Sequence, residues 1–306
     1  MPFFKLEQYK SELLSPFPEI FEFGYEKYNR INLGTLEQHT NPGIEICSIK
    51  EGKYSWVVED KSYVLYPKNA FVTMPWERHG SKEGFLDIGV LFWIILIPKN
   101  IDKLGNLILG EHFSTDRNLT QIIGKMLVSK TQPVILEGSE VGKIFEALSW
   151  EVFHRPLGYV NRVYHLLFDL LLIIARYQLE KTEHLEDNSI DLKALDIALC
   201  EDLAHDWSVE DMANIVSKGL TSFTNMLKTQ TGFTPLNYLI QLRIEESKKL
   251  MLNDKVKITQ VAWMCGFSSS QHFATTFKLK TGLSPSEFLK RSADIGKNNG
   301  KQKSKY

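Results

Sequence analysis

The pattern of hydrophobic and polar positions changes character along the chain. From Ile31 to about Pro98, short apolar runs alternate with period two and are separated by turn residues such as Asn41-Pro42-Gly43. Strands of this length and even spacing predict an antiparallel β-barrel or jelly roll. From Val141 the apolar period lengthens to three and four residues, which predicts helices between about 140 and 180. Residues 1–30 are rich in aromatic side chains and show no clear period.

A further pattern fills Trp207–Lys290 and occurs twice. In each copy a glycine ends one helix, and Ser or Thr followed by Pro begins the next. The repeated residues are Phe223, Lys228, Thr231-Gly232 and Thr234-Pro235, then, fifty positions later, Phe273, Lys278, Thr281-Gly282 and Ser284-Pro285. Between the copies, Leu236–Leu252 has no glycine or proline and predicts one long connecting helix.

The second copy shows most clearly what the repeated unit is. Ala262 lets two helices approach closely, and Gly266 can adopt the left-handed conformation of a tight turn. Ser268 with Gln271 predicts a capping box at the start of the next helix. We therefore expect two helix-turn-helix units on one rigid helix, able to enter successive major grooves of DNA. The large apolar side chains should form the core of this region: Trp207, Phe223, Leu227, Trp263, Phe267, Phe273 and Phe277.

At these residues the chain resembles the AraC/XylS family of bacterial transcription regulators. The matching positions are Trp207, Ala213, Phe223, Lys228, Gly232, Pro235, Arg243, Ala262, Gly266, Phe267, Ser268, Phe273, Phe277, Lys278, Gly282 and Pro285. The resemblance implies DNA binding through two recognition helices, about Thr221–Gln230 and Ser269–Lys280. It places base contacts at Thr221, Thr224, Asn225, Ser269, Ser270, Gln271 and Thr275, and phosphate contacts at Lys228, Lys278 and Arg243, although solvated lysines are the alternative for the phosphate contacts.

Two features depart from the family pattern. Asn225 and Thr275 stand where an arginine is common, so strong bidentate contacts to guanine are missing. The first unit has Ser217-Lys218-Gly219 where a turn glycine followed by a capping serine is usual. The geometry of its turn is therefore less clearly defined by the sequence.

The N-terminal strands resemble a cupin barrel, and AraC-type regulators commonly carry such a domain as a ligand sensor. The stretch LYPKNAFVTMPWERH resembles the second cupin motif, and His39 with Glu45 lies where the first would be. A full metal set needs two closely spaced histidines there, so we expect no metal and no cofactor. The expected pocket residues, for a small-molecule effector such as a sugar, are His39, Glu45, Trp56, Arg78, His79 and Trp93. The alternative is that the aromatic residues among them only pack in the core, as aromatic residues in strands commonly do.

Charge separates the two parts of the chain. The net charge is −1, yet Trp207–Tyr306 contains 15 Lys and Arg against 7 Asp and Glu. A basic C-terminal third suits binding to phosphate, although lysines of a solvated tail supply part of the excess. Cys47, Cys200 and Cys265 lack metal or redox spacing and are expected to be small buried residues in a reducing cytoplasm. No apolar run is long enough to span a bilayer, and no catalytic motif points to an enzyme.

The resulting expectation is an α+β chain of two domains. Residues 1–180 form a cupin-like sensor and dimerisation domain, 181–190 a linker, 191–290 the all-α double helix-turn-helix domain, and 291–306 a basic disordered tail. The family resemblance adds a homodimer, held by one of the helices at 140–180, with promoter DNA and RNA polymerase as partners. Burial of both helices within one subunit is the alternative. Two other interpretations remain: a metal-dependent cupin enzyme fused to a DNA-binding module, and a ligand-independent dimeric regulator.

Overall fold

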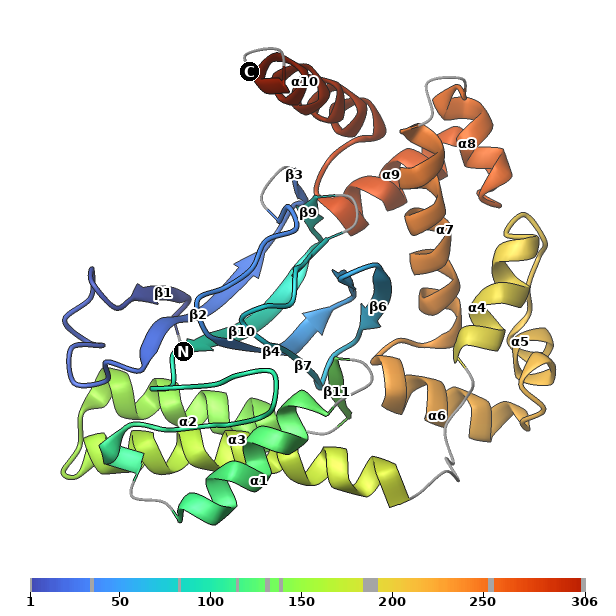
Figure 1. The fold of residues 1–306 in the computed structure, drawn as a ribbon. Helices are drawn as coiled ribbons and strands as arrows, with labels where there is room; N and C mark the ends of the chain where they lie inside the picture. The colour runs from blue at the N-terminus through green and yellow to red at the C-terminus, as the bar shows by residue number, and fades with distance from the viewer. Residues whose placement is uncertain are drawn as a thin grey trace. The chain divides into compact units, whose positions relative to one another are not determined.

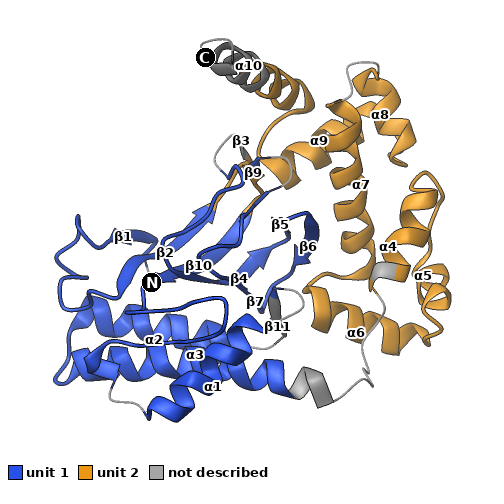
Figure 2. Cartoon of the chain, in the orientation of Figure 1, with its two compact units in different colours: residues 1–27, 36–84, 89–187 blue, residues 28–35, 85–88, 188–306 orange. Residues whose placement is uncertain are grey.

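The computed structural model describes residues 2–33, 36–81, 84–113, 116–129, 133–137, 140–183, 192–252 and 256–303. The chain forms two compact units (Figure 2). Unit 1 comprises residues 1–27, 36–84 and 89–187, and unit 2 comprises residues 28–35, 85–88 and 188–306. Two short pieces of the N-terminal region therefore belong to the same unit as the C-terminal helices.

Unit 1 contains two β-sheets. The larger sheet has the strand order β1-β2-β10-β4-β7-β11, with β1 Phe4–Glu7, β2 Ile20–Tyr28, β10 Gly89–Leu96, β4 Ile44–Gly52, β7 Asn69–Thr73 and β11 Val134–Glu137. The smaller sheet has the order β6-β5-β8, with β6 Lys61–Leu65, β5 Tyr54–Val58 and β8 His79–Gly80. Neighbouring strands pair antiparallel, as in β4 with β10 and β5 with β6. The expectation of an antiparallel sheet region is confirmed. Closure of these sheets into a barrel stays a prediction.

Two features of these sheets differ from the sequence prediction. Residues 1–30, which showed no clear period, supply β1 and the nine-residue strand β2. Within β2, Phe21, Phe23 and Tyr25 alternate with Glu22, Gly24 and Glu26, a period-two signal that the sequence interpretation missed. The apolar run at 85–97 is interrupted: Phe85–Leu86 forms β9, which pairs with β3 (Asn32–Leu33) in unit 2, and Gly89 begins β10.

Helices pack against the larger sheet of unit 1 (Figure 1). They are the short 3-10 helix η1 Glu111–Phe113, α1 Arg117–Val128, α2 Glu140–His154 and α3 Tyr159–Glu183. The two predicted helices are therefore confirmed. In α3, Leu167, Leu170 and Ile174 are fully buried within the subunit, and in α2 Phe145 stacks on Phe92 of β10 at 5.3 Å between ring centroids. Among the described residues, no helix combines the length and apolar character needed to cross a membrane.

Unit 2 is helical apart from the two-stranded ribbon β3–β9. Its helices are α4 Leu192–Glu201, α5 Val209–Ile215, α6 Leu220–Thr231, α7 Pro235–Met251, α8 Ile258–Met264, α9 Ser270–Thr281 and α10 Pro285–Lys303. The long connecting helix is confirmed as α7. The expected linker at 181–190 falls mostly outside the described residues. Helix α10 continues to Lys303, where the sequence indicated a disordered tail from residue 291, because no proline interrupts it.

The ribbon contributes to the core of unit 2. Ile31 and Phe85 pack with Phe273, Phe277 and Phe288, and the Ile31 amide donates to the Thr281 carbonyl at 2.8 Å. Next to Phe85, the Lys248 ammonium is only 3% exposed and is paired with Asp87 at 2.7 Å and Glu245 at 3.1 Å. Burial opposes the charge on Lys248, but the two carboxylates outweigh it and raise its pKa.

Two core expectations are wrong. Trp263 is 61% exposed, because Val261, Ala262 and Cys265 face the core and leave the intervening positions of α8 toward solvent. Cys200 is also exposed, at the end of α4, whereas Cys47 and Cys265 are buried as expected. Trp207 is half-buried, and the remaining predicted core residues of this region are buried.

Candidate nucleic-acid interface and effector site

The repeated sequence unit of the C-terminal region folds twice into the same local structure. In the first unit α5 leads through a turn into α6, and in the second α8 leads into α9. The turn residue with left-handed backbone is Ser217 (φ 52°) in the first and Gly266 (φ 73°) in the second. Gly232 and Gly282 then end α6 and α9, both in the left-handed conformation. Two helix-turn-helix units follow one another along α7.

The start of the second recognition helix differs from the prediction by one residue. The N-cap of α9 is Ser269, whose hydroxyl accepts from the His272 amide at 3.0 Å, so the expected capping box of Ser268 with Gln271 is wrong. The Phe267 amide donates to the Ala262 carbonyl, which prolongs the turn and delays the helix. In the first unit the N-cap is Gly219, without any side-chain cap.

The same pattern of burial recurs in the two recognition helices. Phe223 and Leu227 of α6 are buried, as are Phe273 and Phe277 of α9. Three positions in each helix are exposed at spacings of four and three residues: Thr221, Asn225 and Lys228 in α6, and Gln271, Thr275 and Lys278 in α9. Residues at this spacing share one face of a helix, so each unit presents two polar side chains followed by a lysine. Within the described residues, neither lysine has a carboxylate within ion-pair distance.

The structure engages three of the predicted DNA-binding residues in other contacts and half-buries a fourth. Thr224 is half-buried and its hydroxyl donates to the Leu220 carbonyl of its own helix. The Arg243 guanidinium donates to the carbonyls of Leu203 and His205, both at 3.0 Å, which fixes α7 to the loop between α4 and α5. Ser269 caps α9, and Ser270 beside it is half-buried.

Two exposed residues near the interface were not predicted. His272 follows Gln271 in the first turn of α9, and its ring nitrogen Nδ1 lies 3.0 Å from the Ser268 hydroxyl. Helices α5 and α8 match at 49 positions rather than fifty, as Ala213 with Ala262 shows, so Trp263 of α8 corresponds to Asn214, which is exposed on α5. Aligning the two copies at this spacing would have indicated that Trp263 faces solvent.

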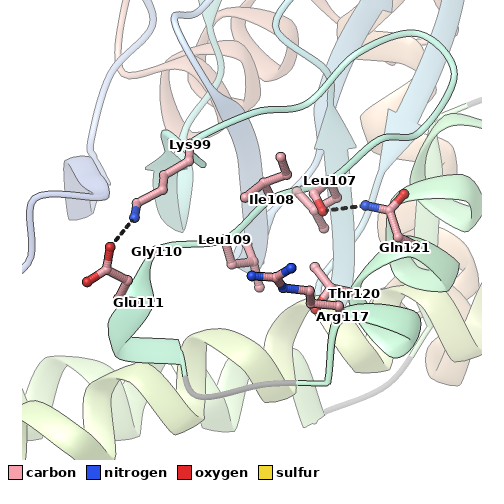
Figure 3. Close-up of a pocket in the computed structure, with 9 residues that line it drawn as sticks. All are labelled: Lys99, Leu107, Ile108, Leu109, Gly110, Glu111, Arg117, Thr120 and Gln121. Atoms are coloured by element: carbon pink, nitrogen blue, oxygen red, sulfur yellow. Dashed lines mark hydrogen bonds and ion pairs between the residues drawn. The ribbon is translucent and has the colours of Figure 1, made fainter.

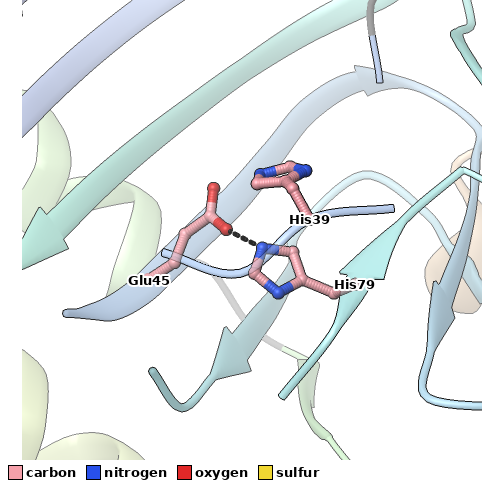
Figure 4. A group of neighbouring side chains, drawn as sticks. All are labelled: His39, Glu45 and His79. Carbon is pink, nitrogen blue, oxygen red and sulfur yellow. Dashed lines mark ion pairs between the residues drawn. The ribbon is translucent and has the colours of Figure 1, made fainter. Parts of the chain in front are cut away.

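In unit 1, three of the six predicted effector residues converge (Figure 4). One ligand atom from each of His39, Glu45 and His79 lies within 4.8 Å of the others. The His79 ring is fully buried, and its Nε2 is 2.6 Å from Glu45 Oε2; the Glu45 side chain is 12% exposed. Asn41 donates to the same carboxylate at 2.7 Å.

The pKa shifts in this group follow from the ion pair between Glu45 and His79. Burial alone would raise the pKa of Glu45, but the hydrogen bond and charge of His79 outweigh it and hold that pKa below its ordinary value. Burial likewise disfavours the charged His79 imidazole, yet Glu45 outweighs it and raises the His79 pKa. Burial, with Glu45 nearby, raises the pKa of the Cys47 thiol well above its ordinary range.

The other three predicted effector residues do not join this group. Trp56 and Trp93 are buried in the sheets, the latter donating its indole N–H to Glu22. Arg78 is exposed, and its backbone pairs with Glu59 near the turn between β5 and β6. Both tryptophans therefore fit the alternative, that aromatic residues in strands pack in the core.

The C-terminal geometry agrees with sequence comparisons. A family model described as a helix-turn-helix domain matches residues 212–291. The transcriptional activator RhaS of Escherichia coli is 33% identical over 120 residues, which cover 39% of this chain and 42% of RhaS. Residues 212–291 therefore carry a helix-turn-helix domain. This domain contains every residue predicted to contact DNA, whereas the His39–Glu45–His79 group lies outside the matched part.

Solved structures give a consistent but weaker comparison. An AraC-type regulator from Chromobacterium violaceum is 24% identical, covering 33% of this chain and 91% of that one, with a TM-score of 0.32. ToxT from Vibrio cholerae, in a structure with bound unsaturated fatty acid, is 16% identical, covering 86% of this chain and 96% of that one, with a TM-score of 0.33. Superpositions of this quality support no residue-by-residue correspondence. The chain aligns with less than half the length of RhaS, so similarity establishes the helix-turn-helix domain alone.

Unit 1 also has an open pocket of about 740 Å³ between the 97–110 segment and α1 (Figure 3). Its wall includes the ion pair of Lys99 with Glu111 at 2.7 Å, and Gln121, which donates to the Leu107 carbonyl at 3.0 Å. Arg117, at the start of α1, also lines it. None of the predicted effector residues contributes to this pocket.

Proposed function

We propose that this protein is a transcription regulator that binds promoter DNA through α6 and α9. The observation that carries the proposal is the repeated face of two polar side chains followed by a lysine, set on paired helix-turn-helix units. A polar, weakly charged surface at the start of a helix is suited to reading base edges in the major groove, and the lysines are suited to phosphates.

The contacts divide by chemistry. Gln271 is in the first turn of α9, where a recognition helix contacts bases, and its amide can bond adenine in a bidentate way. Thr221, Asn225 and Thr275 would make single hydrogen bonds or methyl contacts. Lys228 and Lys278 would bind phosphates without reading sequence. Arg243 is left out of the interface, because two of its N–H groups donate to backbone carbonyls and hold the guanidinium against the loop between α4 and α5.

The first prediction separates base reading from phosphate binding. Genomic sites occupied by the protein would first define an operator fragment. Gln271→Ala should then weaken binding to that fragment by about 1–3 kcal/mol and relax preference at a single base pair. Lys278→Ala should weaken binding to all sequences alike and reduce the salt slope by about one. Fluorescence anisotropy over a salt series measures both.

Lys125→Ala, on the exposed surface of α1 in unit 1, is the matched control and should leave both quantities unchanged. Equal loss of affinity on operator and random DNA in both recognition-helix variants would contradict these contact assignments. Failure of the wild-type protein to select any genomic site would contradict the regulator itself.

The rest of the proposal concerns the N-terminal region. Residues 1–180 would be a cupin-like barrel with sensor and dimerisation roles, 181–190 a linker, and 191–290 the DNA-binding domain of a cytoplasmic homodimer. The antiparallel sheets and the converging polar group of unit 1 support an effector site. Effector binding would reorient the DNA-binding domains and change which half-sites are reached, with RNA polymerase as the eventual partner. Light scattering with and without operator DNA tests the dimer, and a monomer in both states would exclude it.

A further inference from the structure

A second pocket of unit 1 lies where β4 passes the start of α2. Its volume is about 290 Å³, at the lower end of the range of about 300–1,000 Å³ that ligand pockets cover. Phe92 of β10 lines it and stacks on Phe145 of α2, so the pocket is on the helix-covered face of the larger sheet. Ser48 of β4 faces this pocket, three residues from Glu45, whose side chain therefore points to the opposite face. The pocket is thus separate from the His39–Glu45–His79 group.

Positive charge predominates around this pocket. Three lysines and one glutamate line it. Lys50 is paired with Glu146 at 2.8 Å. Lys68 and Lys143 are exposed, and neither has a carboxylate within ion-pair distance in the described part of the chain. The two lysines without an ionic partner leave the pocket suited to an anion.

The backbone of Lys68 fixes its place at the rim. Lys68 follows Pro67 in the turn between β6 and β7, and its amide donates to the Ile49 carbonyl of β4 at 2.8 Å. Its φ is 74°, at a turn position after proline where glycine or asparagine is usual. The left-handed conformation costs a lysine about 1–2 kcal/mol. The turn therefore holds an ammonium group beside β4 at an energetic cost.

A buried hydroxyl is an independent indication of a ligand. Ser48 is only 4% exposed and lines the pocket. Its hydroxyl has no hydrogen-bond partner within the described residues. Because buried polar groups normally have such a partner, the Ser48 hydroxyl is left to bond a molecule in the pocket.

The first turn of α2 forms the opposite wall. The helix has 15 residues and begins at Glu140, so the amides of Gly142 and Lys143 are among the first four, which lack partners within the helix. These amides and the helix dipole favour an anion at this end. An added Cβ at Gly142 would lie 3.7 Å from the Ser48 hydroxyl oxygen. The helix start and the buried hydroxyl therefore face the same small space.

We propose that this pocket binds the phosphate group of a small phosphorylated molecule. The ammonium groups of Lys68 and Lys143 neutralise the phosphate, and the Ser48 hydroxyl and the amides at the start of α2 donate to its oxygens. A phosphate monoester carries a charge of about −1.5 to −2 at pH 7, which matches two lysines better than a single carboxylate does. The use of this pocket as an effector site rests on the proposed function.

Isothermal titration calorimetry of the full chain tests the site. Glycerol 3-phosphate is the probe, with glycerol and acetate at equal ionic strength as comparisons. The wild-type protein should bind about one glycerol 3-phosphate per chain and neither comparison. Lys143→Ala removes one exposed ammonium group, and Lys68→Gly removes another while suiting the left-handed backbone. Each should weaken binding about tenfold, as expected for a lost hydrogen bond to a charged group.

Two lysines elsewhere provide matched controls. Lys125→Ala on α1 and Lys278→Ala on α9 change exposed residues and should leave this affinity unchanged. An equal loss in Lys278→Ala would place the phosphate on the DNA-binding surface and overturn the site. Absence of binding, equal binding of acetate, or equal affinity of wild type, Lys68→Gly and Lys143→Ala would also overturn it. Circular dichroism of each variant checks that the folds compared are the same.

Operator binding separates occupancy from regulation. Operator affinity is measured with and without glycerol 3-phosphate, and a change that disappears in Lys143→Ala supports the effector role. Unchanged operator affinity with an occupied pocket overturns the effector role alone. Phosphate binding by a protein that selects no genomic DNA supports the pocket and overturns the proposed function.

Discussion

At the scale of single residues, the two interhelical turns differ in how they meet the same backbone requirement. Gly266 has φ 73°, and an added Cβ there would lie 2.2 Å from the Leu203 carbonyl oxygen and 2.7 Å from an Arg243 guanidinium nitrogen. Ser217, with φ 52°, holds the matching position in the first unit with a side chain. The left-handed conformation costs a non-glycine residue about 1–2 kcal/mol, so the first turn is the strained one.

We predict that Gly266→Ala lowers the free energy of unfolding by roughly 2 kcal/mol or more, through both strain and steric overlap. Ser217→Gly should raise it by up to about 1 kcal/mol, since the strain removed exceeds the chain entropy that glycine adds. Urea unfolding measures both. Gly219→Ala is the control: nothing lies within 4 Å of its added Cβ, and a change as large as that at Gly266 would refute the steric explanation.

Residue spacing predicted which side chains of the recognition helices are exposed, but it did not predict the contacts of residues such as Arg243. The exposure of Gln271 and Lys278 followed from the positions of Phe273 and Phe277, because helical period alone fixes which side a residue faces. The backbone contacts of Arg243 depend on Leu203 and His205, forty residues away, and local spacing carries no such information. Local spacing likewise does not bring His39 and Glu45 to His79; the cupin resemblance grouped them, and the fold joins His39 to His79 by a β-bridge and Glu45 to His79 by an ion pair.

At the scale of elements, capping boxes define where helices begin. Ser284 and Glu287 form a capping box at α10: the Glu287 carboxylate accepts from the Ser284 amide at 2.7 Å, and the Glu287 amide donates back to the Ser284 hydroxyl at 3.2 Å. Ser208 and Asp211 do the same at α5. Both carboxyl pKa values are lowered, first by these hydrogen bonds from the capping serine.

The pH dependence of this cap has a definite sign. A lowered pKa in the folded state means that the carboxylate stabilises the fold above its unfolded pKa, and that this contribution disappears as pH falls through the folded value. Glu287→Gln should therefore lower the thermal midpoint at pH 7, and the difference from wild type should shrink below about pH 4.5. Ser284→Ala should cost about 0.5–2 kcal/mol. A gap between Glu287→Gln and wild type that is constant from pH 7 to pH 3 would contradict this role.

The elements themselves were predictable to different degrees. Helices with a strong apolar stripe, such as α3 and α7, emerged from the sequence with nearly the observed bounds. Strands β1 and β2 did not, although both alternate apolar and polar residues, because the alternating runs FKLE and FEFGYE are short and lie in a stretch where aromatic residues are frequent throughout. The run at 85–97 concealed a break, since Phe85 and the residues of β10 are equally buried although they belong to different units.

At the scale of the whole molecule, neighbours in sequence do not always share a hydrophobic core: residues 28–35 and 85–88 belong to unit 2, although the segments around them belong to unit 1. Phe85 is 4% exposed, packs edge-on against Phe288 at 6.1 Å between centroids, and lies beneath the Lys248 ammonium. We predict that Phe85→Ala destabilises unit 2 by about 3–5 kcal/mol, through lost apolar burial and a residual cavity. Hydrogen exchange of the amides of α7 and α9 during urea unfolding reports on this unit. Phe3→Ala, at a side chain that is 51% exposed, is the control and should leave that transition in place.

The β3–β9 ribbon also bears on how the protein can be dissected. A truncated product starting at residue 192 would keep all seven C-terminal helices but lack Ile31 and Phe85, and so would present the bare aromatic surface of Phe277 and Phe288 to water. Such a surface promotes self-association. A well-behaved minimal version would need the 28–35 and 85–88 strands supplied as a grafted hairpin, which makes linear deletion mapping a misleading guide to where DNA recognition resides.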